Sequence, residues 1–391
     1  GLNTEAIDHI ASKDGSLIIT VDCGITSVKE VDYAKGLGID VIITDHHECQ
    51  EKLPDAYAVV DPKRDDSSYP FEGICGCGVA FKLIHALSGN EEFYRNINSY
   101  LEIVSLATIC DIMPILDENS IIVKNGMEIL GQGNNLGMQA LLEVCGLDGT
   151  KIKSSHLGFA IGPRINASGR LGFSKLGVEL FTSDSLEEAK SLALMMDSKN
   201  TERQEVEARI HMEVEDILSK DTSYKDDKVL VISGKDWHHG IIGIVASKVT
   251  EKYYKPCILL CQDGDMAVGS ARSIKGFDIF SALYECRDYM TKFGGHQQAA
   301  GMSMKVAKIA LLRDKINKIA NYELNQEDLV EVIKVEYEID QASLDLDLVD
   351  NLHILEPFGI KNPTPYFMMR NCLLKRLMPI GRDKNHLKLL V

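Results

Sequence analysis

The sequence predicts an α/β protein in which a first α/β domain is joined by a long helix to a second, smaller α/β domain. Apolar runs at 17–21 and 41–44 are separated by enough chain for one crossover helix, which predicts neighbouring parallel strands. Between 184 and 221 there is no Gly or Pro, and apolar residues recur at helical spacing. Strand-like and helix-like segments then alternate again between 228 and 321.

The composition is that of a globular protein with more than one domain. At 391 residues the chain exceeds the size of a typical single core, which predicts two or three domains. Apolar residues make up 45% and charged residues 26%, which is the balance of a soluble protein. No run is long enough to span a bilayer, and no secretory signal begins the sequence. The Cys75–Cys77 pair lacks a second pair to complete a zinc site, so we expect reduced thiols in a cytoplasmic protein.

The formal net charge of -16 argues against a surface covered with basic patches for duplex DNA. It does not exclude a nucleic-acid enzyme with a local basic channel. A metal site needs clustered carboxylates, and its cations offset part of their charge where a phosphate binds.

The order of the segments indicates where the domains divide. Residues 2–10 resemble the end of a helix already under way, and 386–391 stop in mid-strand, so we expect the sequence to be cut at both ends. The connecting segment is either one helix or two helices joined near Ser198, with Ser185 as its amino-terminal cap. We expect a first domain at 1–180, a connecting helix at 184–221 and a second domain at 226–322. A linker helix and the beginning of a β-rich segment are expected at 328–391.

Acidic and imidazole side chains follow the two predicted parallel strands. Asp22 ends the first run, and Asp45-His46-His47 closes the second. Open α/β sheets bind ligands at the carboxyl ends of their strands, and imidazoles beside carboxylates are good ligands for a divalent metal. Asp111, at the end of an apolar helix-like run, is costly to bury unless it is paired or metal-bound. The alternatives are a helix cap with two surface histidines, and for Asp111 a cap on the turn before Pro114.

Two motifs place cations or imidazoles where an anion could bind. Arg164 and Arg170 flank a predicted turn at 163–170, and guanidinium groups match phosphate bidentately. A surface turn with ordinary salt bridges is the alternative. Trp237-His238-His239-Gly240 lies between a strand and a helix, at a helix amino terminus that favours anions. There the alternative is a Trp that packs against the helix start.

Two further glycine-bearing motifs lie in the predicted second domain. Ser270 and Arg272 follow a strand at 269–273 and could grip a terminal phosphate, although the signal is weak by itself. The paired glycines at 294–301 let backbone approach a ligand closely, and His296 could donate to a phosphate. A plain turn is the alternative for the second motif.

Taken in order, these motifs resemble those of a known family. Val21-Asp22-Cys23-Gly24, Asp45-His46-His47 and the Asp111 segment resemble three metal motifs of the DHH phosphoesterase superfamily. The 294–301 segment resembles the signature of its associated second domain. The Trp237 motif, 163–170 and 355–363 are similar to the bacterial RecJ branch, in which the last of these leads into an OB-fold domain. The resemblance therefore implies a parallel-sheet DHH phosphoesterase domain, a long connecting helix, a smaller substrate-binding domain and the start of an OB fold.

The resemblance also implies roles for the residues of the first domain. Asp22 would bridge two Mn²⁺ or Mg²⁺ ions, and His46 and Asp111 would complete the shell of the second ion. His47 would contact the scissile phosphate. Asp45 would orient a histidine of the site by a hydrogen bond without binding the metal itself.

In the second half of the chain the implied roles concern the substrate. Arg164 or Arg170 would bind the nucleotide backbone, and Ser270 with Arg272 would hold the 5′-terminal phosphate. His296 would reach the substrate from the second domain. His238 is a further candidate for contact with the substrate.

The chain departs from the family in one respect. The family's first motif, Asp-x-Asp, has no match and by the family's order belongs upstream of Gly1. Those acids supply most ligands of the first ion and one ligand of the second. The resemblance therefore leaves open that the chain as given binds one ion weakly or none, and that it is inactive. An upstream segment outside this sequence or a disordered segment accounts for this better than true loss, because the downstream ligands are intact.

The function implied is a 5′→3′ exonuclease that degrades single-stranded DNA to mononucleotides in repair and recombination. A helicase and a single-strand-binding protein are the partners the family implies, and we expect a monomer. One alternative is a phosphodiesterase of the same superfamily that cuts oligoribonucleotides or cyclic dinucleotides. The long helix, the Trp237 motif and the OB-like segment argue against it. The other alternative is a non-catalytic nucleic-acid-binding relative, which the intact ligands disfavour.

Overall fold

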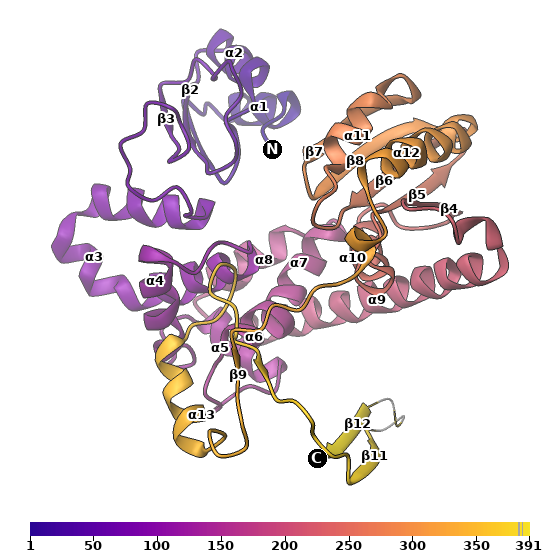
Figure 1. Ribbon diagram of the computed structural model, residues 1–391. Helices are drawn as coiled ribbons and strands as arrows, with labels where there is room; N and C mark the ends of the chain where they lie inside the picture. Colours follow the sequence, from indigo (N-terminus) through magenta and orange to yellow (C-terminus); the bar gives the residue numbers. More distant parts are fainter. Residues whose placement is uncertain (382–383, 385) are drawn as a thin grey trace. The chain divides into compact units, whose positions relative to one another are not determined.

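The computed structural model describes residues 1–381, 384 and 386–391, and they form two compact units. The first unit contains 1–162 together with 334–391, and the second contains 163–333. Figure 1 shows the elements of both units along the chain. Among the helices of these residues, none is long and apolar enough to cross a membrane. The cysteines are free thiols.

The first unit begins with a parallel three-stranded sheet. Its strands β1 (Leu17–Val21), β2 (Asp40–Thr44) and β3 (Ala58–Val60) are ordered β1-β2-β3, and Val21 pairs with Thr44. Helices α1 (Thr4–Ala11) and α2 (Val28–Gly36) bury Ile7 and Val31 against Ile18, Val41 and Ile43 on one face of the sheet. Because β1 and β2 are parallel and pair without a register shift, the residues that follow them lie side by side at the same edge of the sheet.

The rest of the first unit is mainly helical. The helix α3 (Gly76–Cys110) bends at Gly89, whose φ of 71° interrupts the helical backbone, and it ends with Asp111 as its carboxyl-terminal cap. The backbone N–H of Ile115 donates to Ile360, which ties the carboxyl-terminal segment to the helices. The remaining elements are α4 (Asp117–Ile129), α5 (Leu136–Val144), α6 (Ser154–His156), η1 (Leu157–Ile161), β9 (Tyr337–Glu338), α13 (Leu346–Leu352), η6 (His353–Leu355), β10 (Phe367–Met368), β11 (Arg376–Ile380) and β12 (His386–Leu390).

The second unit is built on a mixed five-stranded sheet with strand order β4-β5-β6-β8-β7. Both faces of this sheet are covered, because Val229 and Val231 lie in one apolar cluster while Leu230 and Ile232 lie in another. The strands are β4 (Leu230–Lys235), β5 (Cys257–Asp263), β6 (Met266–Arg272), β7 (Met290–His296) and β8 (Ala299–Lys305). The helices are α7 (Gly162–Arg170), α8 (Lys175–Phe181), α9 (Leu186–Lys220), η2 (Thr222–Tyr224), α10 (Ile242–Tyr253), α11 (Ile279–Glu285), η3 (Arg287–Tyr289), η4 (Val306–Lys308), α12 (Ile309–Glu323) and η5 (Glu327–Leu329).

The structure decides two expectations about local conformation. The connecting segment is one helix, α9, and Ser185 caps it by accepting a hydrogen bond from the backbone N–H of Glu188 at 3.3 Å. The predicted turn at 163–170 is wrong, because this segment is the helix α7. A proline in the first turn of a helix costs no hydrogen bond, so Pro163 did not prevent it.

Candidate metal centre and anion pocket

Asp22 stands at the end of β1 in a conformation that brings its carboxylate against the start of α3. Its φ is 62°, in the left-handed region, and its backbone N–H donates to the carbonyl oxygen of Thr44 at 3.0 Å. A Cβ atom placed on Gly76, the first residue of α3, would lie 2.2 Å from Oδ1 of Asp22. The absence of a side chain at Gly76 therefore permits the position that Asp22 adopts.

His46 brings the two predicted acids together. It is buried, and its Nε2 lies 3.0 Å from Oδ1 of Asp22 and 3.3 Å from Oδ2 of Asp111. These contacts lack the geometry of a hydrogen bond, and neither ring nitrogen of His46 has a hydrogen-bond partner among the described residues. The proximity of Asp22 raises the pKa of His46, and burial raises the pKa of Asp111.

This donor set fits a divalent metal. A neutral imidazole nitrogen and carboxylate oxygens converge on one point, as ligands of Mn²⁺ or Mg²⁺ do. One ligand atom each from Asp22, His46 and His47 also lies within 4.8 Å of the others.

Asp45 is a buried carboxylate that organises the turn after β2. Its Oδ2 accepts the backbone N–H of Ile25 at 2.9 Å, and its Oδ1 accepts the N–H of His46 at 2.8 Å. Oδ1 also lies 2.7 Å from Nδ1 of His47, whose side chain is exposed. Burial opposes ionisation of Asp45, yet these hydrogen bonds hold its pKa below the ordinary value. The ring of His47 is therefore oriented by an ionised Asp45, which adjoins the convergent ligands rather than joining them.

Asp61, which follows the third parallel strand, is a further acid near the site that was not among the predicted residues. Asp61 is buried, burial raises its pKa, and its Oδ2 has no hydrogen-bond partner among the described residues. The charge of Asp45 raises that pKa further. Like Asp22 and Asp45, Asp61 is an acid at the carboxyl end of a parallel strand, and this position in the sequence could have identified it.

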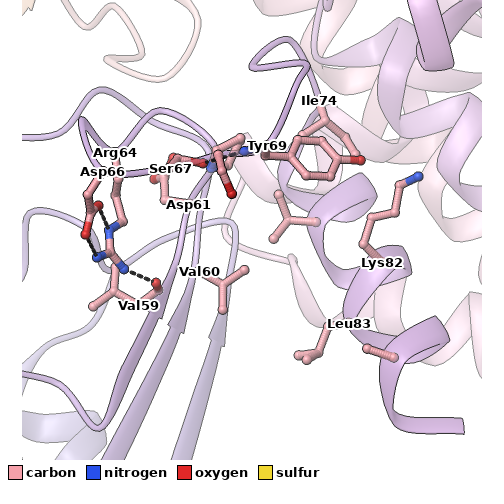
Figure 2. Close-up of a pocket in the computed structure, with 14 residues that line it drawn as sticks. Val59, Val60, Asp61, Arg64, Asp66, Ser67, Tyr69, Ile74, Lys82 and Leu83 are labelled. Carbon is pink, nitrogen blue, oxygen red and sulfur yellow. Dashed lines mark hydrogen bonds and ion pairs between the residues drawn. The ribbon is translucent and has the colours of Figure 1, made fainter.

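Asp61 also lines a pocket of about 530 Å³ between β3 and α3, shown in Figure 2. The guanidinium group of Arg64 is turned toward Asp66 and the carbonyl oxygen of Val59. Lys82 on α3 forms an ion pair with Glu118. Both cations of this pocket therefore face carboxylates of the chain itself, which offset their charge.

In the second unit, predicted substrate residues meet at the amino end of α10. Nη1 of Arg170 donates to the carbonyl oxygen of Gly240 at 3.0 Å, and Nη1 of Arg272 donates to Oγ of Ser270 at 3.0 Å. A Cβ atom on Gly243 would lie 2.9 Å from Oγ of Ser270 and 3.0 Å from Nη2 of Arg272. We call these five residues the anion pocket.

The electrostatics of the anion pocket favour a negative ligand. Burial lowers the pKa of Arg170 and of Arg272, and the charge of Arg170 lowers that of Arg272 further. Two guanidinium groups close enough to repel each other, beside a helix amino terminus, attract an anion that would relieve the repulsion. His238 borders the pocket, because its Nδ1 accepts the backbone N–H of Gly240 at 3.1 Å.

Arg164 and His296, the other predicted substrate residues, lie apart from this pocket. Nε of Arg164 donates to Oδ1 of Asp197 on α9 at 2.8 Å. His296 lies in the same row of the sheet as Arg272, because both pair with Ala299. With one strand between them, about 10 Å separates the two backbones.

Family models match three parts of the chain. The DHH family, N-terminal domain, matches residues 2–108, the DHHA1 domain matches 226–321, and the RecJ OB domain matches 335–391.

Curated relatives align over the whole chain. The single-stranded-DNA-specific exonuclease RecJ of Bacillus subtilis is 38% identical over 100% of this chain and 49% of the relative. The protein of the same name from Escherichia coli is 34% identical over 100% of this chain and 70% of the relative. The chain thus spans about half the length of the first relative.

Solved structures match as well. RecJ of Thermus thermophilus in complex with Mn²⁺ has a TM-score of 0.86 at 27% identity, over 100% of this chain and 57% of that chain. An exonuclease RecJ bound to manganese has a TM-score of 0.69 at 28% identity, over 84% of this chain and 83% of that chain. The first of these matches has the fold described above over the whole chain, which contains a parallel-sheet DHH domain, a DHHA1 domain and an OB-fold segment.

Proposed function

The chain belongs to the RecJ family of DHH phosphoesterases, and from that premise we propose that it is a metal-dependent exonuclease. Its substrate is single-stranded DNA, which it degrades from the 5′ end to mononucleotides in repair and recombination. The observation that carries this proposal is the convergence of Asp22, His46 and Asp111 beside the Asp45–His47 pair. Such a cluster suits hydrolysis of a phosphodiester better than binding alone.

In this proposal Asp22, His46 and Asp111 hold Mn²⁺ or Mg²⁺. When bound, such an ion makes hydroxide available near neutral pH and neutralises charge that develops on the phosphoryl oxygens. His47 contacts the scissile phosphate, and Asp45 keeps its ring in one orientation through the 2.7 Å contact to Nδ1. Because Nδ1 is held by Asp45, Nε2 of His47 is the ring nitrogen left to donate to a phosphate oxygen, and it is oriented before the reaction begins.

The polarity follows from the anion pocket. Ser270 and Arg272 bind the 5′-terminal phosphate, with Arg170 beside them and the amino end of α10 beneath. Arg164 or Arg170 binds the nucleotide backbone, and the pairing of Arg164 with Asp197 favours Arg170. His238 and His296 supply further contacts to the strand.

The cellular setting of this activity is part of the proposal. A strand with a free 5′ end is produced by a helicase and covered by a single-strand-binding protein, so both are expected partners. We expect the enzyme to act as a monomer in the cytoplasm, at duplex ends opened by such a helicase.

The test uses the protein expressed with whatever its gene encodes upstream of Gly1, which we call the gene-length protein. Single strands labelled at the 5′ or the 3′ end are incubated with Mn²⁺, and the products are sized. We expect mononucleotides that carry the 5′ label first, loss of activity with His46→Asn, and full activity with His9→Asn on the surface of α1. Release that begins at the 3′ end would refute the polarity. Preference for RNA or cyclic dinucleotides would refute the substrate.

A further inference from the structure

Phe159 is a large aromatic side chain held in solvent by a short turn of π-helix. The turn η1 places Leu157 and Ile161 on one side, where both are fully buried. Phe159 lies midway between them and therefore points to the opposite side, where it is 86% exposed. Single exposed apolar residues are common, so exposure alone assigns no role.

The turn η1 that carries Phe159 packs against the end of α3, next to one of the proposed metal ligands. Sγ of Cys110, at the end of α3, lies 3.7 Å from the carbonyl oxygen of Leu157. A Cβ atom on Gly158 would lie 3.6 Å from Cγ2 of Ile109. The turn that carries Phe159 therefore packs against the residues that lead directly into Asp111.

A second exposed apolar residue follows that acid. Ile112 has a φ of 59°, in the left-handed region that a β-branched residue rarely adopts, and it is 67% exposed. The side chain of Ile112 is largely exposed, so its burial does not offset the cost of this backbone conformation. Residues that retain a costly backbone conformation are often part of functional sites.

From this geometry we propose that Phe159 and Ile112 form a base platform, on which the base beside the scissile phosphate stacks. The inference rests on the proposed function, since it concerns a strand bound at the metal centre. A phosphodiester bound at Asp111 places the faces of its bases within one nucleotide of that acid. Ile112 directly follows Asp111, and the turn of Phe159 packs against Ile109 and Cys110, so both exposed apolar side chains lie in this neighbourhood. Stacking suits an exonuclease that must accept every base, because each base has a π face.

The test combines variants of the gene-length protein with two strands. One is a 5′-phosphorylated single strand with natural bases, and the other has abasic residues at its first nucleotides. The variants are Phe159→Ala, Phe159→Trp and the control Tyr57→Ala, which removes a 77% exposed aromatic group just before β3, at the opposite end of the sheet from Asp22. KM and kcat are measured with Mn²⁺, and equilibrium binding is measured without divalent metal.

We expect Phe159→Ala to raise KM on the natural strand about 5- to 150-fold, the factor that corresponds to one stacked base. Phe159→Trp and Tyr57→Ala should stay close to the unmodified protein. On the abasic strand Phe159→Ala should have no effect, and its thermal unfolding should be unchanged. An equal loss on both strands, or none on either, would overturn the platform.

The design separates this inference from the proposed function. If the unmodified protein hydrolyses neither strand, the exonuclease proposal fails, and the binding titration decides the platform. Weaker binding of Phe159→Ala to the natural strand alone then supports stacking, whereas equal binding to both strands overturns it.

Discussion

Glu102, on α3, offers a test of the structure that is independent of function. Glu102 is 1% exposed, and its Oε1 accepts a hydrogen bond from Nδ2 of Asn134 at 3.2 Å. Its Oε2 has no hydrogen-bond partner among the described residues. Burial raises the pKa of Glu102 from 4.5 to about 7, despite hydrogen bonds to the side chain of Asn134 and to the backbone of Asn135 and Gly131. The folded protein therefore binds this proton more tightly than the unfolded chain does.

The sign and size of the effect on stability follow from these two values. The stabilising contribution of the protonated carboxyl is complete below pH 4.5 and is lost as the pH rises through about 7. At about 1.4 kcal/mol for each pH unit between the two pKa values, the loss approaches about 3 kcal/mol. Roughly 2 kcal/mol of it falls between about pH 5.5 and 8.5. Glu102→Gln removes the titration, and any cost of its unpaired amide is the same at every pH.

The assay is urea unfolding of wild type and Glu102→Gln at both pH values, followed by circular dichroism. Relative to the variant, wild type should lose roughly 2 kcal/mol on going to the higher pH. The control Glu92→Gln, at an exposed position of the same helix, should parallel wild type. If wild type and Glu102→Gln lost the same stability, the raised pKa assigned to the buried carboxyl of Glu102 would be refuted.

Three further predictions concern the site. Gly76→Ala puts a Cβ atom 2.2 Å from Oδ1 of Asp22 and should weaken Mn²⁺ binding at least about tenfold in calorimetry; unchanged affinity would contradict the role of Asp22. Asp45→Asn removes the charge that orients His47 and should lower kcat by roughly 10- to 100-fold, with a smaller change in KM. Gly243→Ala crowds the anion pocket and should raise KM more for 5′-phosphorylated strands than for 5′-hydroxyl strands; an equal rise would argue against binding of the terminal phosphate there.

Much of the fold was predictable because its signals are local. Apolar runs ending at Asp22 and Thr44 predicted β1 and β2, and the absence of Gly and Pro predicted α9. The failure at 163–170 has the same origin. Pro163 and Gly169 are breaker signals in isolation, but the segment buries Ala167 and Ser168, and that packing stabilises the helix α7.

The anion pocket was predictable only in part. Sequence reasoning selected Ser270, Arg272 and Arg170 from separate motifs, each with a surface turn or a weak signal as the alternative. The packing of α10 on the sheet places Ser270 and Arg272 beside Gly243, and the hydrogen bond from Arg170 on α7 to Gly240 brings Arg170 to the same helix end. Such pairings join residues far apart in the chain, so local patterns do not reveal them.

By itself, the sequence determined which side chains follow the parallel strands, because the local pattern of apolar residues shows where each strand ends. The family resemblance implied different roles for the neighbours His46 and His47, but only the tertiary structure showed the contacts that distinguish them. One is buried between Asp22 and Asp111, while the other is exposed and hydrogen-bonded to Asp45. The physical reason is that both histidines lie in the turn after β2, and the surroundings of each ring depend on Asp22 and Asp111, which belong to elements far away in the sequence.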